Sequence, residues 1–542
     1  MEKTYRSIVK WGDKHEEILE EGVKVLVKEK FGYTDDDFQP NYLRGDEEVI
    51  LPDSKLPEAV ADSLIKICGK ENVDISAYGR ALHSYGYFYT DLLNLRKGNI
   101  ATPPAAVVSP RTEEEIEEIV HLCNRKKIAI TPVGGRSSVT RGVETPHGGI
   151  SLDLSKHFNK VLEVNETNLT VTVQPGISGP ELEKHLNSFG QGYTCGHFPQ
   201  SFEYSCVGGW VAARGAGQES TYYGKIDNLV LSLKIIAPAG VIETKTFPAS
   251  AEGWDIMRTF IGSEGALGII TRVVLKIKPN REEQAAYASF IMKDFESATK
   301  CMRQIMQSET GYPALFRISD PDETATAFKI KGFDNSKEDK ILKVLGYKPG
   351  KRCLMFISLK GDADRNQLMK KKIKKIAKKN GGFSTGKKPV VEWLGQRYSS
   401  SYLRDPLMDI GIMTDTVETA VMWDQLVPLW KAVRRYLFQR DKIHVMTHIS
   451  HVYENGANLY FTFLSPMKKG KEMEDYLQLH KGLIDSIHQN GGSLSHHHGI
   501  GRALAPWMEE EIGKTGMGMM QAVKDFLDPK GIMNPGNTLG LH

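Results

Sequence analysis

Val207-Gly-Gly-Trp-Val-Ala-Ala-Arg-Gly-Ala-Gly217 is the stretch of sequence that decides the fold of this chain. Glycine has no Cβ, so a glycine-rich turn lets the backbone approach a bound group closely, and successive N–H groups in such a turn form a concave site for anions. The stretch therefore predicts a backbone cradle for a phosphate group. A single passage of this kind is equally typical of an ordinary turn, so the neighbouring sequence has to decide.

Three more segments of similar character lie on either side of it, at Pro132–Ser138, Gln200–Cys206 and Glu264–Ile270. Together they could supply backbone N–H groups to several phosphate oxygens, as a dinucleotide requires. No Gly-x-Gly-x-x-Gly opens a helix and no Gly-x-x-x-x-Gly-Lys-Ser/Thr occurs, so the chain carries neither the Rossmann nor the P-loop signature.

Helices and strands alternate around these segments. Thr112–Lys126 has apolar residues at helical spacing, and Ile128–Thr131 is a short strand that breaks into the first glycine turn. After about Arg281 the glycine density falls, and lysine-rich helices alternate with strands such as Leu354–Leu359 and Leu459–Phe463. The pattern predicts an α+β protein with a second domain after that point.

Composition limits the function classes. A chain of 542 residues needs two or three domains, and 70 Lys and Arg against 67 Asp and Glu leave a net charge of only +3, which argues against nucleic acid as a partner. Six cysteines without a Cys-x-x-Cys pair argue against a disulfide framework or a thiolate zinc site. With no apolar run of membrane-spanning length and no secretion signal, we expect a cytoplasmic protein.

Three adjacent histidines, His496, His497 and His498, stand in a glycine-framed turn near the end of the chain. Histidine titrates near neutral pH, so it can accept and donate protons within one turnover. Extended backbone would send His496 and His498 to one side and His497 to the other, which does not suit joint ligation of one ion. We therefore expect acid–base work or anion binding and no metal site, with a solvated polar loop as the alternative.

Taken in order, the glycine segments resemble the FAD-binding domain of the vanillyl-alcohol-oxidase (PCMH) type over roughly Ala101–Lys278. The closest matches are Val207–Gly217, Tyr223-Gly-Lys-Ile-Asp-Asn-Leu-Val and Gly262-Ser-Glu-Gly-Ala-Leu-Gly-Ile-Ile-Thr. The resemblance implies a domain of two subdomains that holds FAD on these loops.

Arg136 stands where many relatives have a third glycine, so this loop has no histidine for a covalent bond to the flavin, and we expect non-covalent FAD. Cys195 and Cys206 are the remaining candidates for covalent attachment. The residues that the resemblance places around FAD are Pro132, Val133, Gly134, Gly135, Arg136, Ser137, Ser138, Gln200, Ser201, Phe202, Glu203, Tyr204, Ser205, Cys206, Gly208, Gly209, Ala213, Arg214, Gly215, Ala216, Glu264, Gly265, Ala266, Leu267, Gly268, Ile269 and Ile270.

The C-terminal half resembles the alkyldihydroxyacetonephosphate synthase family, whose hallmark is matched by Ser495-His-His-His-Gly-Ile-Gly501. Gly456-Ala-Asn-Leu-Tyr460 matches the segment with the family's catalytic tyrosine, Ser401-Tyr-Leu-Arg404-Asp the segment with its substrate arginine, and Phe316-Arg317-Ile another arginine segment. Lys10-Trp-Gly is similar to a shortened N-terminal motif of the family.

This resemblance implies an enzyme that exchanges the acyl chain of acyl-dihydroxyacetone phosphate for a fatty alcohol, through an adduct with the flavin and without net redox change. It implies that Tyr460 transfers a proton and that His496, His497 and His498 serve the leaving group and the alcohol. Arg404 and Arg317 would bind the substrate phosphate. The phosphorylated lipid ketone and the fatty alcohol would then be its small-molecule partners.

Other interpretations stay open. FAD-dependent D-2-hydroxyacid dehydrogenases share the fold, and the tail Asp528-Pro-Lys-Gly-Ile-Met-Asn-Pro-Gly is closer to theirs, although their Gly-Glu-His-Gly metal-binding segment is replaced here. A flavin fold kept only as a binding module is a third class. Tyr460 could be an ordinary strand residue, and Arg317 and Arg404 could form salt bridges to Asp320 and Asp405.

The expected domains are an N-terminal helical covering segment (1–100), the FAD-binding domain (101–281), an α/β cap or substrate domain with an antiparallel sheet (282–500) and a C-terminal segment that returns to the FAD domain (501–542). We also expect a homodimer. The lysine-rich stretch Met369–Lys379 predicts a solvated amphipathic helix, with peripheral contact to anionic lipid as the alternative.

Overall fold

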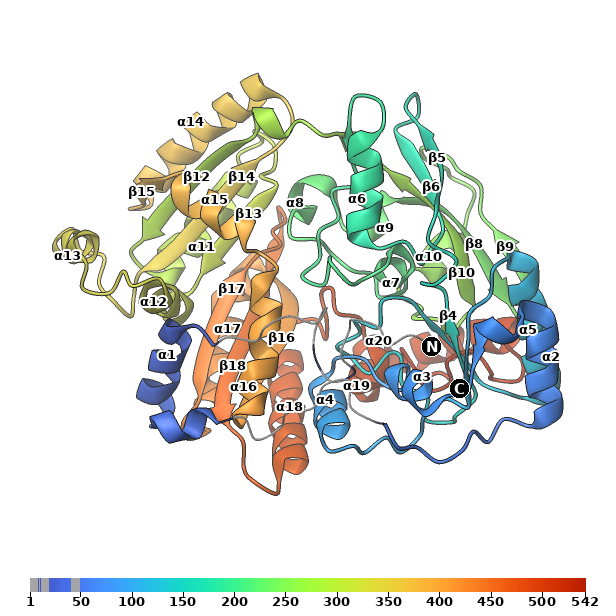
Figure 1. Ribbon diagram of the computed structural model, residues 1–542. Coiled ribbons are helices and arrows are strands. Elements are labelled where there is room, and N and C mark those ends of the chain that lie inside the picture. Colours follow the sequence, from blue (N-terminus) through green and yellow to red (C-terminus); the bar gives the residue numbers. More distant parts are fainter. Residues whose placement is uncertain (1–7, 9, 11–18, 40–48) are drawn as a thin grey trace.

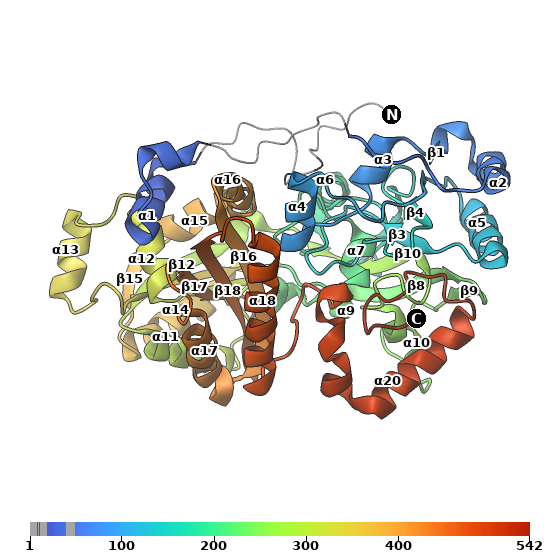
Figure 2. The same cartoon turned by 90° about the horizontal axis from the view of Figure 1, so that it is seen from below.

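The computed structural model describes residues 8, 10, 19–39 and 49–542. Trp11 and Gly12 of the N-terminal motif lie outside the described residues. Figure 1 shows two lobes, one built mainly from residues before β12 (Ala286–Met292) and the other mainly from β12 and the residues that follow. The C-terminal helices α19 (Gly501–Leu504) and α20 (Met508–Leu527) lie against the first lobe (Figure 2).

The first lobe opens with a small sheet of order β1-β2-β4-β3, in which β2, β4 and β3 run parallel. Helix α5 (Glu113–Lys126) begins where the Thr112 side chain accepts the N–H of Glu115, and it ends at Lys127 in a left-handed conformation. Its Ile116, Ile119, Val120 and Cys123 are buried, as the helical spacing predicts. The strands and the second helix here are β1 (Val73–Asp74), β2 (Ala106–Val108), β3 (Ile130–Val133), β4 (Ile150–Asp153) and α2 (Glu58–Cys68).

A five-stranded antiparallel sheet of order β5-β6-β10-β8-β9 forms the rest of this lobe. The stretch Val207–Gly217 lies on it as a short helix, α7 (Val207–Ala212), followed by a turn. Gly208 permits this packing, because a Cβ there would lie 2.6 Å from the Pro175 side chain. The other elements are β5 (Val161–Asn165), β6 (Thr170–Val173), α6 (Gly179–Ser188), β7 (Tyr193–Thr194), α8 (Ser220–Tyr223), α9 (Ile226–Leu229), β8 (Val230–Ala237), β9 (Gly240–Glu243), α10 (Ile256–Phe260), β10 (Ile269–Lys276) and β11 (Lys278–Pro279).

The second lobe is a seven-stranded sheet of order β15-β12-β14-β13-β17-β18-β16, and all of its strand pairs are antiparallel. Side chains alternate between its faces along each strand. One face packs into the largest apolar core with α11 (Phe295–Met306), α14 (Ala363–Lys379), α17 (Trp423–Leu437) and α18 (Glu472–Gln489). The strands are β12 (Ala286–Met292), β13 (Leu315–Ser319), β14 (Cys353–Leu359), β15 (Phe383–Gly386), β16 (Ile412–Met422), β17 (His444–Ile449) and β18 (Gly456–Pro466).

The other face of this sheet lies toward the first lobe and toward α12 (Pro321–Ile330), α13 (Lys337–Val344) and α15 (Lys388–Gly395) (Figure 1). Helix α14 is amphipathic as predicted, because Met369, Ile373 and Ala377 are buried while most of its lysines are exposed. No helix in the described ranges is both long and apolar enough to cross a lipid bilayer.

The N-terminal helices contact both lobes. Helix α1 (Glu21–Phe31) packs against the second lobe in a cluster with Leu407 and Ile412, whereas α2 packs on α5 in the first. Between them, α3 (Ala77–Leu82) and α4 (Tyr89–Arg96) lie at the junction, where Arg96 forms ion pairs with Asp405 and Asp409 of α16 (Arg404–Asp409). These N-terminal helices therefore join the lobes in addition to covering them.

Candidate active site

A cavity of about 1480 Å³ lies between the lobes. The glycine segments of the first lobe form one wall, and the open face of the seven-stranded sheet forms the other. Pockets for one drug-sized ligand usually measure about 300–1,000 Å³. This volume therefore suits a large cofactor together with a second, sizeable molecule.

The predicted cradle segments meet at close quarters. A Cβ on Gly135 would lie 1.9 Å from the Tyr204 carbonyl oxygen, and one on Gly134 would lie 3.3 Å from the Cys206 side chain, so segments 132–138 and 200–206 cross where only glycine fits. Arg136 has a φ of 55°, a left-handed backbone conformation that favours glycine. Its guanidinium Nη1 donates to the Leu82 carbonyl at 3.3 Å.

Most of the residues expected around FAD line the cavity. They are Pro132, Val133, Gly134, Gly135, Arg136, Ser137, Ser138, Gln200, Ser201, Ser205, Cys206, Gly208, Gly209, Ala213, Gly215, Ala216, Glu264, Gly265, Gly268 and Ile270. The others do not reach its wall: Phe202 stacks on Tyr398, Glu203 and Tyr204 bond to Tyr402, Arg214 pairs with Asp227, and Ala266, Leu267 and Ile269 are buried in the first lobe. These seven residues pack against the rest of the protein and do not face the cavity.

His197 was not anticipated from the sequence, although only Phe198 and Pro199 separate it from the cradle segment 200–206. It lines the cavity beside the Trp210 ring, and neither of its ring nitrogens has a hydrogen-bond partner among the described residues. Gln218 leaves its Oε1 unpaired in the same wall. Buried polar atoms without partners are rare, so these atoms indicate a polar ligand, and they fit a dinucleotide cofactor held on the glycine segments.

The loop with the three histidines is organised by one carboxylate, Glu418 of β16. It accepts hydrogen bonds from the N–H groups of His496, His497 and His498 at 2.6, 3.1 and 3.0 Å, and from the Ser495 hydroxyl at 2.6 Å. Burial alone would raise the pKa of Glu418, but His498 and the donated hydrogen bonds outweigh burial and hold the pKa below its usual value.

This arrangement overturns the expected orientation of the histidines. The backbone curls around the Glu418 carboxylate instead of extending, so the Nδ1 atoms of His496 and His497 lie 2.9 Å apart on the same side. His497 and His498 line the cavity, and His496 lies behind them with Nε2 bonded to the Tyr453 hydroxyl at 2.5 Å. A glutamate in a distant strand is not visible as a partner of this loop in the sequence.

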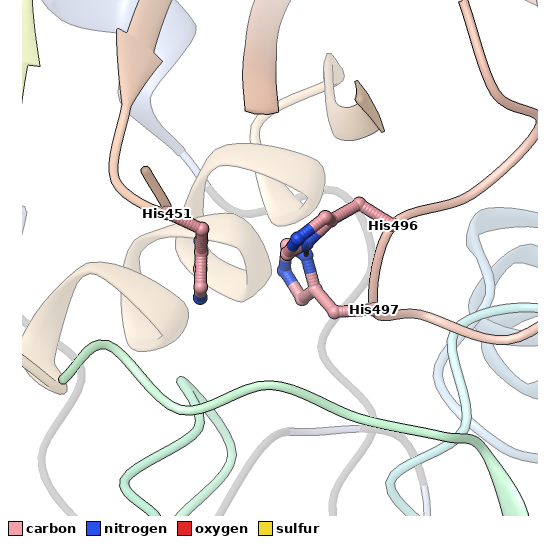
Figure 3. Close-up of side chains that lie close together, drawn as sticks. All are labelled: His451, His496 and His497. Carbon is pink, nitrogen blue, oxygen red and sulfur yellow. Dashed lines mark hydrogen bonds between the residues drawn. The ribbon is translucent and has the colours of Figure 1, made fainter. Parts of the chain in front are cut away.

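His451, which follows β17, lies close to His496 and His497 of the loop (Figure 3). One ring nitrogen from each of His451, His496 and His497 lies within 4.8 Å of the others. His451 Nδ1 bonds to Ser450 Oγ at 2.9 Å, and its Nε2 has no partner among the described residues. Burial, followed by the charge of neighbouring histidines and Lys225, lowers the pKa of each well below its usual value.

Three neutral imidazoles at this spacing could hold a divalent transition metal, which the sequence did not lead us to expect. The Lys225 ammonium, which donates to the His496 carbonyl at 2.6 Å, opposes a cation here. The His496–His497 hydrogen bond also occupies two of the donor atoms.

Tyr460 is the fifth residue in a row that crosses six strands. The register pairs Ile291 with Leu354, Leu354 with Ser319, Ser319 with His448, His448 with Tyr460, and Tyr460 with Glu418. Tyr460 stacks on His448 with ring centroids 4.6 Å apart, and its hydroxyl donates to Thr416 Oγ1 at 3.0 Å. Burial raises the pKa of Tyr460 to about 12, so the hydroxyl is protonated at neutral pH.

The two expected substrate arginines both line the cavity, but their partners differ from the salt bridges considered above. Arg404 donates from Nη1 to the Tyr87 carbonyl at 2.9 Å, and its buried Nε has no partner. Its neighbour Asp405 pairs with Arg96 instead. Arg317 is paired with Glu323 at 2.5 Å, whereas Asp320 pairs with Arg434.

Comparison with known proteins gives a consistent result. The model of the FAD binding domain matches residues 104–245, and that of the C-terminal domain of FAD linked oxidases matches residues 281–538. The chain is 34% identical over 472 residues to alkyldihydroxyacetonephosphate synthase of Dictyostelium discoideum, which covers 84% of this chain and 76% of the relative. For the same enzyme of Caenorhabditis elegans, the identity is 31% over 533 residues, with coverage of 92% and 88%.

Among solved structures, one alkyldihydroxyacetonephosphate synthase superposes with a TM-score of 0.84 at 27% identity, and the match covers 97% of this chain and 98% of that one. The similarity therefore extends over both lobes, the cavity between them and the C-terminal helices.

Proposed function

This chain belongs to the alkyldihydroxyacetonephosphate synthase family, and we propose from that premise that it exchanges the acyl chain of acyl-dihydroxyacetone phosphate for a fatty alcohol. In this exchange the bond from the substrate C1 carbon to the acyl oxygen breaks, and a bond to the alcohol oxygen forms. A fatty acid leaves, the alcohol gives up its hydroxyl proton, and no electrons are gained or lost overall.

The observation that carries the proposal is the composition of the cavity. One continuous space joins the glycine cradle, a group of proton-transfer residues and an apolar branch. The apolar branch is lined by Ile291, Leu315, Phe328, Leu354, Phe356 and Trp393. Each buried CH₂ contributes about 0.8 kcal/mol of binding free energy, so such a branch suits a long alkyl or acyl chain.

Arg404 is our candidate for binding the substrate phosphate. Its side chain keeps donors free beside the cavity, and a guanidinium can bind phosphate oxygens in pairs. Arg317 is held by Glu323 and would act as a second cation near the substrate.

FAD on the glycine segments would supply an electrophilic ring system that can hold the activated substrate carbon. His197 and Gln218 would hydrogen-bond it, together with backbone N–H groups of the cradle. We expect the attachment to be non-covalent, because position 136 is an arginine and burial raises the pKa of the Cys195 thiol, which keeps that thiol protonated and unreactive.

Tyr460 is our candidate for moving the carbon-bound proton of the substrate. Its protonated hydroxyl can act only if the tyrosinate form becomes accessible, and the charge of Arg404 favours that form. His497 and His498, held by Glu418, would serve the carboxylate that leaves.

The cluster of His451, His496 and His497 favours a second candidate, a metal-dependent FAD-linked D-2-hydroxyacid dehydrogenase. In that case the bound ion would hold the hydroxyacid. Glu418, the nearby carboxylate, is already committed to the backbone of the loop and is not available as a further ligand. The synthase is therefore the better supported proposal.

One experiment separates the two functions. The purified protein, saturated with FAD, is given acyl-dihydroxyacetone phosphate and labelled hexadecanol, with and without a chelator, and in parallel D-2-hydroxyacids with a redox dye. We expect labelled ether product that the chelator does not change, and no dye reduction. Chelator-sensitive dye reduction without ether product would establish the dehydrogenase instead. A colourless protein that takes up no FAD would contradict both, and flavin that stays with acid-precipitated protein would contradict only the non-covalent attachment.

We also infer that the enzyme acts in the cytoplasm as a homodimer at membrane surfaces, because both lipid substrates partition into membranes. The exposed lysines of α14 would contact anionic lipid. Co-sedimentation with phosphatidylserine vesicles, compared with phosphatidylcholine vesicles, tests the surface contact. Light scattering after gel filtration measures the oligomeric state.

A further inference from the structure

His448 and Glu323 form a carboxylate–imidazole pair in the cavity wall, and the proposed function has so far given neither side chain a role. His448 Nδ1 lies 3.0 Å from Glu323 Oε2, while the other oxygen of Glu323 accepts hydrogen bonds from Arg317 and from the Ser319 hydroxyl at 2.9 Å. Burial would raise the pKa of Glu323, but Arg317 and His448 hold the pKa far below its usual range. The carboxylate is therefore ionised.

An ionised Glu323 fixes the tautomer of His448. Nδ1 must carry the proton and donate it to Oε2, which leaves the lone pair of the ring on Nε2. Nε2 has no hydrogen-bond partner among the described residues, and the ring lines the cavity. A histidine oriented by a carboxylate on one nitrogen and open to a ligand on the other is the arrangement of a general base.

The position of His448 within the sheet indicates which proton its ring meets. Along the row that crosses the sheet, Ile291 and Leu354 are apolar, and Ser319, His448 and Tyr460 follow on successive strands about 4.8 Å apart. His448 thus lies between the apolar branch and Tyr460. A long-chain alcohol whose tail fills the apolar branch would bring its terminal hydroxyl to this strand.

We propose that His448 is the catalytic base for the incoming alcohol: Nε2 takes the hydroxyl proton as the alcohol oxygen forms its bond to the substrate C1 carbon, and Glu323 is its positioning residue. The O–H bond breaks, an N–H bond forms, and an oxygen lone pair becomes the new C–O bond. The acyl carboxylate has already left with its own bonding pair. This inference rests on the proposed exchange reaction.

Within the histidine loop, both ring nitrogens of His496 are bonded, one to Tyr453 and one to His497. His497 and His498 are assigned above to the carboxylate that leaves. His448, in contrast, is ready to accept a proton, because burial and the charge of Arg317 lower its pKa and keep it neutral, against the opposing effect of Glu323.

The test uses the FAD-loaded full-length enzyme with His448→Gln, which keeps a hydrogen-bond donor for Glu323 but has no group that titrates near neutral pH. Two quantities are measured in a single turnover: fatty acid released from acyl-dihydroxyacetone phosphate, and labelled hexadecanol incorporated. We expect release within about threefold of the unmodified enzyme and incorporation lower by a factor of about 10²–10⁴. A long-chain alcohol fluorinated next to its hydroxyl is more acidic, so it should recover much of the lost incorporation.

His444→Gln is the matched control. His444 lies four residues earlier in the same strand and on the same face, but its Nε2 bonds to Thr326 Oγ1 at 2.8 Å and its side chain does not line the cavity. Both measured quantities should stay near those of the unmodified enzyme. Glu323→Gln should lower the ratio of incorporation to release in the same direction by a smaller factor, a change that partial unfolding alone would not produce.

Equal loss of release and incorporation in His448→Gln, or equal loss with the ordinary and the acidic alcohol, would overturn the role of His448. If the unmodified enzyme releases fatty acid but incorporates no alcohol, the exchange reaction itself is wrong and the assignment of His448 falls with it. Normal incorporation in both the unmodified enzyme and His448→Gln would reject the catalytic role of His448 alone and leave the proposed function in place.

Discussion

Glu418 shows how much one residue determines in this site. A single buried carboxylate receives three backbone N–H groups and one hydroxyl, and thereby turns a flexible histidine run into a fixed loop beside the cavity. Charge-assisted hydrogen bonds of this kind are about twice as strong as neutral ones. The roles of individual side chains can therefore be tested by small substitutions that leave this frame intact.

Tyr460→Phe keeps the stacked ring and removes only the hydroxyl that bonds to Thr416. We expect alcohol incorporation to fall by a factor of about 10²–10⁴, because the group that moves the carbon-bound proton is lost. FAD content and the visible spectrum should not change. Retained exchange activity would reduce Tyr460 to an ordinary strand residue.

Arg404→Ala removes a guanidinium whose Nε has no partner in the described structure. We expect binding of the phosphorylated ketone to weaken by about 2–5 kcal/mol, as for the loss of one side of a buried charge pair. The KM of this substrate should rise while that of the alcohol and the FAD content stay constant. Parallel loss of flavin and activity would instead identify a structural arginine.

The sequence predicted which residues lie at the site better than it predicted their hydrogen-bond and ion-pair partners. The glycine segments, Tyr460, Arg404, Arg317 and two of the three histidines do line one cavity. In contrast, Glu418 joins the site through the pairing of β16 with β18, and the pairing register between distant strands cannot be read from local pattern. His451, which follows β17, and Glu323 of α12 reach the site through tertiary packing, which local pattern does not reveal either. Arg317 pairs with Glu323 of the following helix α12, while Asp320 is engaged by Arg434 of α17, a distant partner that the sequence does not reveal.

At the scale of elements, packing between helices makes the free energy of unfolding depend on pH. His480 of α18 lies against the ring of Phe88, which directly precedes α4, with ring centroids 5.3 Å apart, and burial lowers the pKa of His480 to about 4. Between pH 6.5 and 4 the unfolded chain therefore binds one proton more than the folded protein at this residue. Its contribution to the free energy of unfolding falls on acidification by about 1.4 kcal/mol per pH unit.

His480→Leu should remove this contribution. The decrease in unfolding free energy between pH 7 and pH 5, measured by urea denaturation, should be smaller than in the unmodified protein by about 2 kcal/mol. His121→Leu, on the exposed face of α5, is the control and should leave the decrease unchanged. An identical decrease in all three proteins would show that His480 does not titrate in this range on unfolding.

At the scale of the whole molecule, the two lobes are joined by an N-terminal helix as well as by the chain crossing between them. Arg96 of α4 is 3% exposed and pairs with Asp405 at 3.0 Å and Asp409 at 3.1 Å. Both carboxylates belong to α16, the helix that starts at Arg404. The joint between the lobes is therefore also the support of the proposed phosphate-binding arginine.

Arg96→Met should leave two buried carboxylates without this partner and lower the free energy of unfolding by about 3–5 kcal/mol. The KM of the phosphorylated ketone should rise as well, because the start of α16 loses its anchor. Thermal denaturation and steady-state kinetics measure the two effects. Arg111→Met breaks an exposed ion pair with Glu115 and should lower the free energy of unfolding by less than about 1 kcal/mol. An equal decrease for both variants would argue against the role of Arg96 in joining the lobes.

The alternation of side chains in the seven-stranded sheet has a consequence for how this enzyme can change. In β18, the even-numbered Tyr460, Thr462 and Leu464 line the cavity, while the odd-numbered Leu459, Phe461 and Phe463 are buried in the opposite core. Selection for a new substrate and selection for foldability therefore act on separate, interleaved sets of positions. A directed-evolution library confined to the even positions would explore new chemistry while every member inherits the same scaffold.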